Sequence, residues 1–286
     1  FPPEHGLRVP GDSLAPEVAT LGTLLQSAGY RTAAFFADPA LVSATGLTRG
    51  FSHCDAPSAE PVLPSDGGNL HYRAFPAPPG AEIRPAAQVA DAAIAWIQEN
   101  TGQKGGARKR NQTPFLAWVQ FADTRRTDLP DTARPSRTEP TNAHHRAVAA
   151  MDHQFGRLLD ALDQAGLRDR TLVLITGVHG AWPGSEAPAE EGLALNEALL
   201  QVPCALRWPE RIAAGTRITP PCSQTALAPT LLELCGLPES LPVSLRRRSL
   251  AAALTGKAPP PAAGPVYAES LWPAAAYALP PLAGWW

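Results

Sequence analysis

A histidine followed by a glycine stands shortly after an apolar run of this chain. Residues 171–175 read Thr-Leu-Val-Leu-Ile, and His179 and Gly180 come just after them. An apolar, β-branched run of this length predicts a strand that is covered on both faces, as in parallel or mixed sheets. Ligands gather at the carboxyl ends of such strands. The sequence therefore makes His179 a candidate metal ligand.

A hydrogen-bonded histidine is the competing interpretation of the same residue. The position before it is Val178, so no carboxylate stands beside the imidazole to share a metal ion. His144 and His145 offer no better site, because side chains at adjacent helical positions point in different directions and chelate one ion poorly. The histidines alone leave both interpretations of His179 open.

Length and composition describe a protein with a large core and no global charge field. The chain has 286 residues, 44% of them hydrophobic, and a formal net charge of -2. These values exclude a disordered chain and give no general attraction to nucleic acid or to an anionic membrane. The one basic cluster, at residues 104–110, has no interleaved aromatic residues and is interpreted as a solvated loop. No apolar run approaches the roughly 20 residues that span a bilayer, so we predict no membrane segment and no nucleic-acid partner.

The cysteines and the two ends of the chain carry further expectations. Cys54, Cys204, Cys222 and Cys235 are far apart and form no C-x-x-C pair, so we expect small buried hydrophobic residues and neither a zinc site nor a redox pair. The chain opens on Phe1 without an initiator methionine or a signal peptide. We expect a single domain over residues 1–286 that is incomplete at both ends, and the residues assign no localisation.

Helical and strand patterns alternate along the chain. Apolar residues at helical spacing predict helices, which lie at residues 13–28, 86–98, 144–165, 193–200 and 226–234. Apolar and β-branched runs predict strands, which lie at residues 30–36, 114–121, 171–175, 202–208 and 266–269. This alternation predicts an α/β fold with a mixed, mostly parallel central sheet and helices on both faces.

Several of these segments together resemble one enzyme family. The helix-to-strand stretch 21–35, the Gly-Leu-Thr-Arg-Gly-Phe element at 46–51, the Pro-Phe strand at 114–119 and the Ala-Pro-Thr-Leu-Leu helix at 228–232 occur in order. They are similar to the sulfatases, members of the alkaline phosphatase superfamily, across roughly residues 14–270. The resemblance implies the alkaline phosphatase-like fold and, for the family, hydrolysis of sulfate esters. The resemblance supports the fold more strongly than it supports catalysis, because one fold can carry different functions.

The resemblance also implies a nucleophile that this chain does not show. Sulfatases use a formylglycine made from Cys or Ser in a C/S-x-P-x-R motif, and that motif does not occur here. The nearest stretch begins at Cys54, but its proline, Pro57, is one place late and no arginine follows. In the family, the nucleophile and a paired Asp lie upstream of a stretch that resembles residues 5–8, so we expect that portion to precede this chain. We therefore expect no intact catalytic residue.

The positions that the resemblance assigns to the metal and the substrate are altered. The family strand ends in T-S-D-H-G, whereas Gly177 and Val178 stand here in place of Ser and Asp, which leaves His179 as the single metal-ligand candidate. Ca²⁺ needs six to eight oxygen ligands, so we expect the family's Ca²⁺ not to be bound. Arg125 falls about where the family has a P-H-x-P histidine, and Glu191 stands before Gly192 where it has His or Lys. These two are the candidate substrate-binding residues.

Three hypotheses remain open at the level of sequence. In the first, the chain is part of a sulfatase whose nucleophile lies upstream, and its partner is a small-molecule or glycan sulfate ester. In the second, it is a pseudoenzyme that keeps the fold as a binding or scaffolding module while the metal site is lost. In the third, it is related to metal-dependent phosphodiesterases or phosphomutases, which need several Asp and His ligands. The replacements at Val178 and Arg125 favour an inactive chain.

Overall fold

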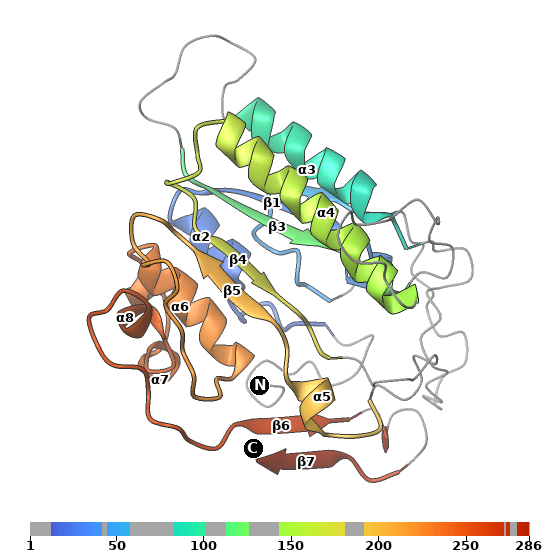
Figure 1. Cartoon of the computed structure of the whole chain (residues 1–286), viewed down its shortest axis with the longest axis vertical. Coiled ribbons are helices and arrows are strands. Elements are labelled where there is room, and N and C mark those ends of the chain that lie inside the picture. Colours follow the sequence, from blue (N-terminus) through green and yellow to red (C-terminus); the bar gives the residue numbers. More distant parts are fainter. Residues whose placement is uncertain are drawn as a thin grey trace. The chain divides into compact units, whose positions relative to one another are not determined.

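A computed structural model gives the structure of the chain (Figure 1). The residues that it describes are 13–41, 45–57, 83–100, 113–125, 143–180, 192–271, 273–274 and 279–285. They form two compact units, the first within residues 13–168 and the second from residue 169 onward, and each unit is described by itself. The basic cluster at 104–110 and Glu191 lie outside the described residues.

A parallel sheet forms the centre of the first unit. Strand β1, Arg31–Phe36, lies between β2, His53–Asp55, and β3, Phe115–Gln120, and both pairings are parallel. The register with β3 runs from Arg31 opposite Phe115 to Phe36 opposite Gln120. The predicted strands 30–36 and 114–121 are confirmed. Strand β2 was not predicted, because it has three residues and no apolar run that could have indicated it.

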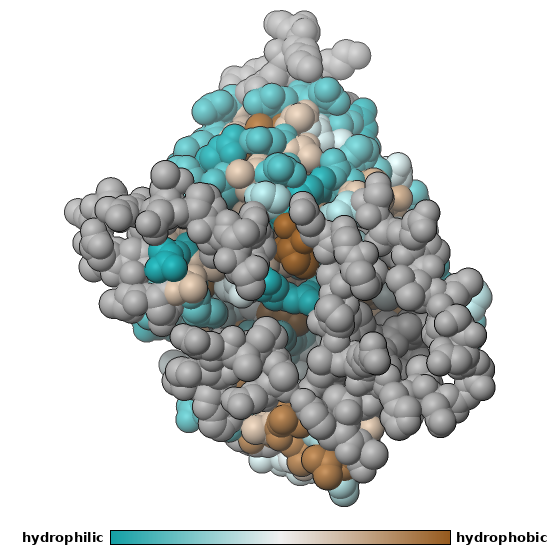
Figure 2. Space-filling model, turned by 90° about the vertical axis from the view of Figure 1, so that its right-hand side faces the viewer, coloured by the Kyte–Doolittle hydropathy of each residue, from teal (hydrophilic) through white to brown (hydrophobic). Residues whose placement is uncertain are grey.

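Helix α3, Ala86–Asn100, covers one face of this sheet. Its Trp96 meets Phe35 of β1 edge-on, with ring centroids 6.2 Å apart, and Phe115 of β3 at 5.8 Å. Helix α4, Ala143–Gln164, packs against α3, and Figure 1 shows the two helices side by side. The surface over these helices is mainly hydrophilic in Figure 2. Each helix therefore presents apolar side chains inward and polar ones to water.

The opposite face of the sheet is covered by helix α2, Leu21–Ser27, and the segment before β2. Phe36 and Trp118 meet on this face with ring centroids 5.0 Å apart, and Phe51 lies 5.9 Å from Trp118. A Cβ at Gly22 of α2 would lie 2.8 Å from the Phe51 ring, so the helix and this segment are in close contact. Both faces of β1 are thus buried, which confirms the predicted α/β layering.

Helix α2 is shorter than the predicted helix 13–28. It begins at Leu21 because Thr20 forms a capping box: the Thr20 hydroxyl accepts the Thr23 N–H at 3.0 Å, and the Thr23 hydroxyl accepts the Thr20 N–H at 2.9 Å. Such a cap satisfies N–H groups that a helix leaves open at its start. The apolar residues upstream of Thr20 continue the helical period without belonging to the helix.

The second unit contains two antiparallel strand pairs and short helices. Strand β4, Val173–Thr176, pairs with β5, Cys204–Arg207, and β6, Tyr267–Ser270, pairs with β7, Leu282–Trp285. The helices are α5, Glu197–Leu200, α6, Leu227–Leu234, α7, Val243–Arg246, and α8, Ala251–Leu254. A small core of Ile212, Leu234, Ala251 and Leu254 joins α6 and α8. The predicted strand 202–208 and helix 226–234 are confirmed with shorter bounds, and the predicted strand 266–269 is confirmed one residue later.

Two expectations for burial were wrong. Strand β4 was expected to be covered on both faces, but Ile175 is 41% exposed and β4 has β5 as its one strand neighbour in the described part of the chain. The cysteines were expected to be buried, but Cys54, Cys204 and Cys222 are exposed residues, with their thiols partly covered, and Cys235 is half-buried. The apolar run at residues 171–175 predicted a strand, but it could not indicate whether that strand belongs to a two-stranded ribbon or to a sheet covered by helices. As for membranes, none of the described helices has the length and apolar character to cross a bilayer.

Candidate functional site

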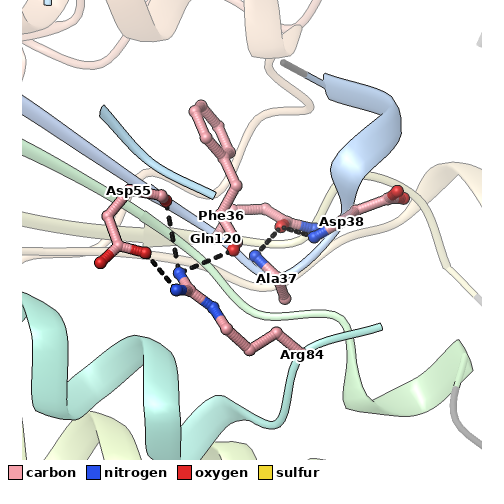
Figure 3. Close-up of polar contacts among 6 residues, drawn as sticks. All are labelled: Phe36, Ala37, Asp38, Asp55, Arg84 and Gln120. Carbon is pink, nitrogen blue, oxygen red and sulfur yellow. Dashed lines mark hydrogen bonds and ion pairs between the residues drawn. The ribbon is translucent and has the colours of Figure 1, made fainter. Parts of the chain in front are cut away.

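The carboxyl ends of β1 and β3 are joined by one glutamine side chain. The Oε1 atom of Gln120, the last residue of β3, accepts the N–H of Ala37 at 2.9 Å and that of Asp38 at 3.1 Å (Figure 3). Ala37 and Asp38 are the first residues after β1. The amide of Gln120 thus fixes the turn that follows β1 and sets where Asp38 lies.

Asp38 binds Arg125, one of the two predicted substrate-binding residues. Arg125 ends the short 3-10 helix Asp123–Arg125, which follows β3, and its Nη1 forms an ion pair with Asp38 Oδ2. The Asp38 side chain is 8% exposed and the Arg125 side chain 42%. A guanidinium beside a carboxylate has its charge largely balanced, which weakens its attraction for a sulfate group. Sequence analysis identified Arg125 but missed its partner.

Two further carboxylates stand at the same edge of the sheet, and each has a partner. Asp55, the last residue of β2, pairs with Arg84, whose Nη2 also donates to the Phe36 carbonyl at 2.8 Å (Figure 3). Both carboxylate oxygens of the buried Asp123 accept the N–H of Ala86, at 3.2 and 3.0 Å, at the first residue of α3. A carboxylate there also interacts favourably with the helix dipole.

The three carboxylates share a sequence signal that could have identified them. Asp38, Asp55 and Asp123 each lie at the end of a parallel strand or within three residues of it. Carboxyl ends of parallel strands are the usual place for a site in an α/β protein. Here an arginine or a helix N-terminus faces each carboxylate, so the interactions position β1, β2, β3 and α3 relative to one another.

In the second unit, His179 lies in the loop after β4. Its Nδ1 is 2.8 Å from the carbonyl oxygen of Gly180, and because a carbonyl only accepts, Nδ1 carries the hydrogen. The Gly180 N–H donates to the Leu199 carbonyl at 2.8 Å, which holds the loop against α5. His179 is an exposed residue, as is Val178 before it, which is 80% exposed.

The oxygen atoms beside His179 are already hydrogen-bonded. Nε2 of Gln224 donates to the Gly177 carbonyl at 2.6 Å and to the Val178 carbonyl at 3.3 Å. Ca²⁺ requires six to eight oxygen ligands, several of them carboxylates. Within the described ranges, no three His, Cys, Asp or Glu side chains are grouped so that they could hold a metal ion. The described residues around His179 thus show no such ligand set, and residues 181–191, which follow the loop, lie outside the described part of the chain.

Comparison with known proteins identifies the family. Residues 1–237 match the family model of the sulfatases. The chain belongs to the sulfatase family. Steryl-sulfatase of Mus musculus is 29% identical over 141 residues, which cover 45% of this chain and 22% of that protein. Steryl-sulfatase of Homo sapiens is 30% identical over 177 residues, which cover 58% of this chain and 28% of that protein. The chain thus spans about a quarter of the length of these curated relatives.

Solved structures agree with this sulfatase assignment at the level of fold. A protein solved in complex with its substrate D-glucosamine-2-N,6-O-disulfate has a TM-score of 0.66 and 18% identity, over 94% of this chain and 71% of that one. A phosphonate monoester hydrolase from Silicibacter pomeroyi has a TM-score of 0.58 and 19% identity, over 96% of this chain and 70% of that one. At such identities the likeness concerns the fold and not the chemistry.

The sulfatase nucleophile motif has its nearest approach at Cys54, whose thiol is poorly suited to attack. Partial burial raises the pKa of the Cys54 thiol above its usual value, and the neighbouring Asp55 charge raises it further. The thiolate is the reactive form of cysteine, so a raised pKa leaves less of it at neutral pH. The structure thus gives no sign that Cys54 is activated.

This raised pKa has a measurable consequence. In a Cys204→Ser/Cys222→Ser/Cys235→Ser variant, where Cys54 is the remaining thiol, alkylation by iodoacetamide should be slow at pH 7. The rate should rise with pH beyond the pKa of an ordinary cysteine, about 8.5. The alkylation is quenched at fixed times and measured by mass spectrometry, which gives the rate at each pH, and glutathione serves as the reference thiol. A rate that levels off below pH 8 would show an activated thiol.

Proposed function

We propose that this sulfatase-family chain forms one domain over residues 1–286 that keeps the family fold without holding the family's cation or hydrolysing sulfate esters. The family match runs from residue 1 to residue 237 and so includes segments of both compact units, which supports one domain. The surroundings of His179 carry the proposal of inactivity. Val178 stands where the resemblance expects an Asp, the residue is 80% exposed, and Gln224 donates to the carbonyls of Gly177 and Val178.

The other altered positions support the same proposal. Arg125, offered above for contact with a sulfate group, is bound to Asp38. Asp38 lies just after β1, where the Gln120 amide holds its backbone N–H. Hydrolysis of a sulfate ester needs positive charge to stabilise the equatorial oxygens of the transferring group, whereas the charge of Arg125 is balanced by that of Asp38. Glu191 remains the second proposed contact to substrate.

A binding role follows from this proposal. A fold that retains its strand ends and loops while lacking the metal can still bind a sulfated molecule, as a non-catalytic module. The neighbour solved with a glucosamine disulfate makes a glycan sulfate ester a reasonable class to test. The first alternative function is hydrolysis of such an ester, with the nucleophile supplied by residues upstream of this chain. The second alternative is a phosphodiesterase-type reaction.

Calcium titration tests the proposal most directly. The longest natural form of the protein, titrated with CaCl₂ in a calorimeter, should give no saturable heat, because Val178 stands where the resemblance expects the Asp that precedes His179. p-Nitrophenyl sulfate should be turned over no faster than in buffer, with and without Ca²⁺. The same assays with p-nitrophenyl phosphate and Mn²⁺ or Zn²⁺ test the phosphodiesterase alternative.

His179→Ala is the matched control for any binding that is observed. Saturable Ca²⁺ binding in the wild type that His179→Ala abolishes would contradict the proposal and place a metal at this loop. Turnover of the sulfate ester that depends on the same residue would establish the enzyme. Ca²⁺ binding that His179→Ala leaves unchanged would also contradict the proposal, and it would place the ion away from this loop.

A further inference from the structure

Strands β6 and β7 form a ribbon whose two faces carry different side chains (Figure 1). The register sets Tyr267 opposite Trp285 and Glu269 opposite Ala283. Opposed residues, and residues two apart along a strand, point to the same face, so these four side chains share one face of the ribbon. On the other face, the Ser270 hydroxyl donates to a backbone carbonyl at 2.6 Å. Ala283 and Trp285 are exposed, so solvent reaches the face with the four side chains, here called the aromatic face.

Trp285 is 69% exposed, although tryptophan is on average one of the more deeply covered residues. Its ring lies 5.1 Å from the ring of Tyr267, measured between centroids, with 59° between the two planes. A cross-strand aromatic pair of this kind stabilises the ribbon, which accounts for one contact of the indole. Most of the indole surface remains in water, where a second group can pack against it.

A small residue stands next to this exposed ring. Ala283 precedes Trp285 by two positions in β7, which places their Cβ atoms about 7 Å apart. Glu269 stands directly opposite Ala283, and Tyr267 lies on the diagonal. The methyl group of Ala283 is shorter than the three side chains that surround it. The aromatic face therefore leaves room for a small group beside the indole, bordered by two rings and a carboxylate.

Glu269 gives the aromatic face its charge. Its Oε2 accepts the Tyr267 hydroxyl at 2.8 Å, and within the described part of the chain its covered Oε1 has no hydrogen-bond partner and no basic side chain pairs with it. With one oxygen engaged and the other covered, the carboxylate offers little to a ligand that needs hydrogen-bond acceptors, such as a sugar. It still attracts a positive charge over a few Å. The faces of aromatic rings attract cations as well.

We propose that the aromatic face binds a small quaternary ammonium ion, which lies against the indole of Trp285 and over Ala283, with the charge of Glu269 beside it. Such an ion carries methyl groups in place of N–H donors, so it needs no acceptor, and its charge is complementary to the rings and to the carboxylate. Because the face is open to water, we expect a dissociation constant of about 1–10 mM. This inference is independent of whether the chain hydrolyses any ester.

Choline and its neutral analogue 3,3-dimethylbutan-1-ol are the probes, because they have nearly the same shape and differ in the charge of one central atom. The full chain, labelled with ¹⁵N, is titrated with each probe at constant ionic strength. The indole N–H signal of Trp285 is assigned from the Trp285→Phe variant. Choline should shift this signal saturably, and the neutral alcohol should bind roughly tenfold more weakly, because it lacks the cation–π and carboxylate attractions.

Two variants separate the charge from the space beside the indole. Glu269→Gln removes the charge but keeps an acceptor for the Tyr267 hydroxyl, and it should weaken choline binding about three- to tenfold. Ala283→Leu fills the space beside the indole and should abolish the shift. The matched control is Ala213→Leu, at an exposed position of the same unit outside the ribbon, which should bind choline as the wild type does.

Several results would overturn the proposal. They are the absence of a saturable shift with choline, equal affinity for the neutral alcohol, and unchanged choline affinity in Glu269→Gln. Methyl glucoside that shifts the Trp285 signal as strongly as choline does would also overturn it, because a sugar site needs no positive charge. Circular dichroism checks the fold of each variant, and Ala283→Val repeats the measurement should Ala283→Leu fold poorly.

Discussion

Replacement of Arg125 by methionine should lower the free energy of unfolding by about 2–4 kcal/mol, because the change leaves a nearly buried carboxylate without its arginine. The Asp38 side chain is 8% exposed, and methionine keeps most of the aliphatic bulk of Arg125 while removing its charge. The burial of Asp38 therefore sets the size of the effect. Urea unfolding followed by far-ultraviolet circular dichroism measures it, with the m-value checked for a two-state transition.

Arg157→Met is the matched control. Arg157 of α4 pairs with Asp91 of α3 at 2.6 Å, but the Asp91 side chain is 61% exposed. A solvent-exposed pair contributes about 0–1 kcal/mol, so this variant should lose little. Adding Asp38→Asn to Arg125→Met should recover part of the loss, because it removes the buried charge. Equal losses in the two single variants, or no recovery in the double variant, would show that Asp38 and Arg125 do not act as a buried pair.

The position of this pair bears on the proposal that this sulfatase-family chain keeps its fold without hydrolysing sulfate esters. The strand ends that would gather around a substrate are occupied by interactions internal to the protein: Arg125 with Asp38, Arg84 with Asp55, and Asp123 with the start of α3. The two arginines and the start of α3 could each contact an anion. Each instead contacts a carboxylate of the protein, and that contact joins two elements of the fold. Stability and substrate binding thus compete for the same side chains.

The layered part of the fold could be predicted because its signals are local. Strands β1 and β3 are continuous apolar runs, and α3 and α4 carry apolar stripes that end near glycine or polar residues. Strand β2 could not be predicted, because its three residues pair with β1 through backbone hydrogen bonds to a strand about 20 residues away. The start of α2 at Leu21 depends on the Thr20 cap, which the apolar period does not reveal.

The candidate site could be predicted in part. The sequence located His179 after a strand and Arg125 after another, and the family resemblance placed Val178 where an Asp is expected. It could not show that Gln224 binds the carbonyls beside Val178, because 46 positions separate the two residues and no pattern connects them. The exposure of Cys204 and Cys222 was missed for a similar reason, since cysteine has no sequence pattern that distinguishes buried from exposed positions.

The glycine after His179 gives the second large expected effect. Gly180→Ala should lower the free energy of unfolding by about 3 kcal/mol, because a Cβ at this position would lie 1.8 Å from the carbonyl oxygen of Ala198 and 2.9 Å from its carbonyl carbon. The contacting atoms are backbone and cannot rotate away. The Gly180 N–H bond to the Leu199 carbonyl, at 2.8 Å, must lengthen if the loop moves.

Gly156→Ala in α4 is the control for the same chemical change. No heavy atom lies within 4 Å of a Cβ built there, and the residue is helical, so alanine should raise stability by about 0.5–1 kcal/mol. Opposite signs for the two variants in urea unfolding would show that the His179 loop is held tightly against α5. A neutral Gly180→Ala would mean that the loop stands away from Ala198 in solution, and that the Leu199 bond does not fix the position of His179.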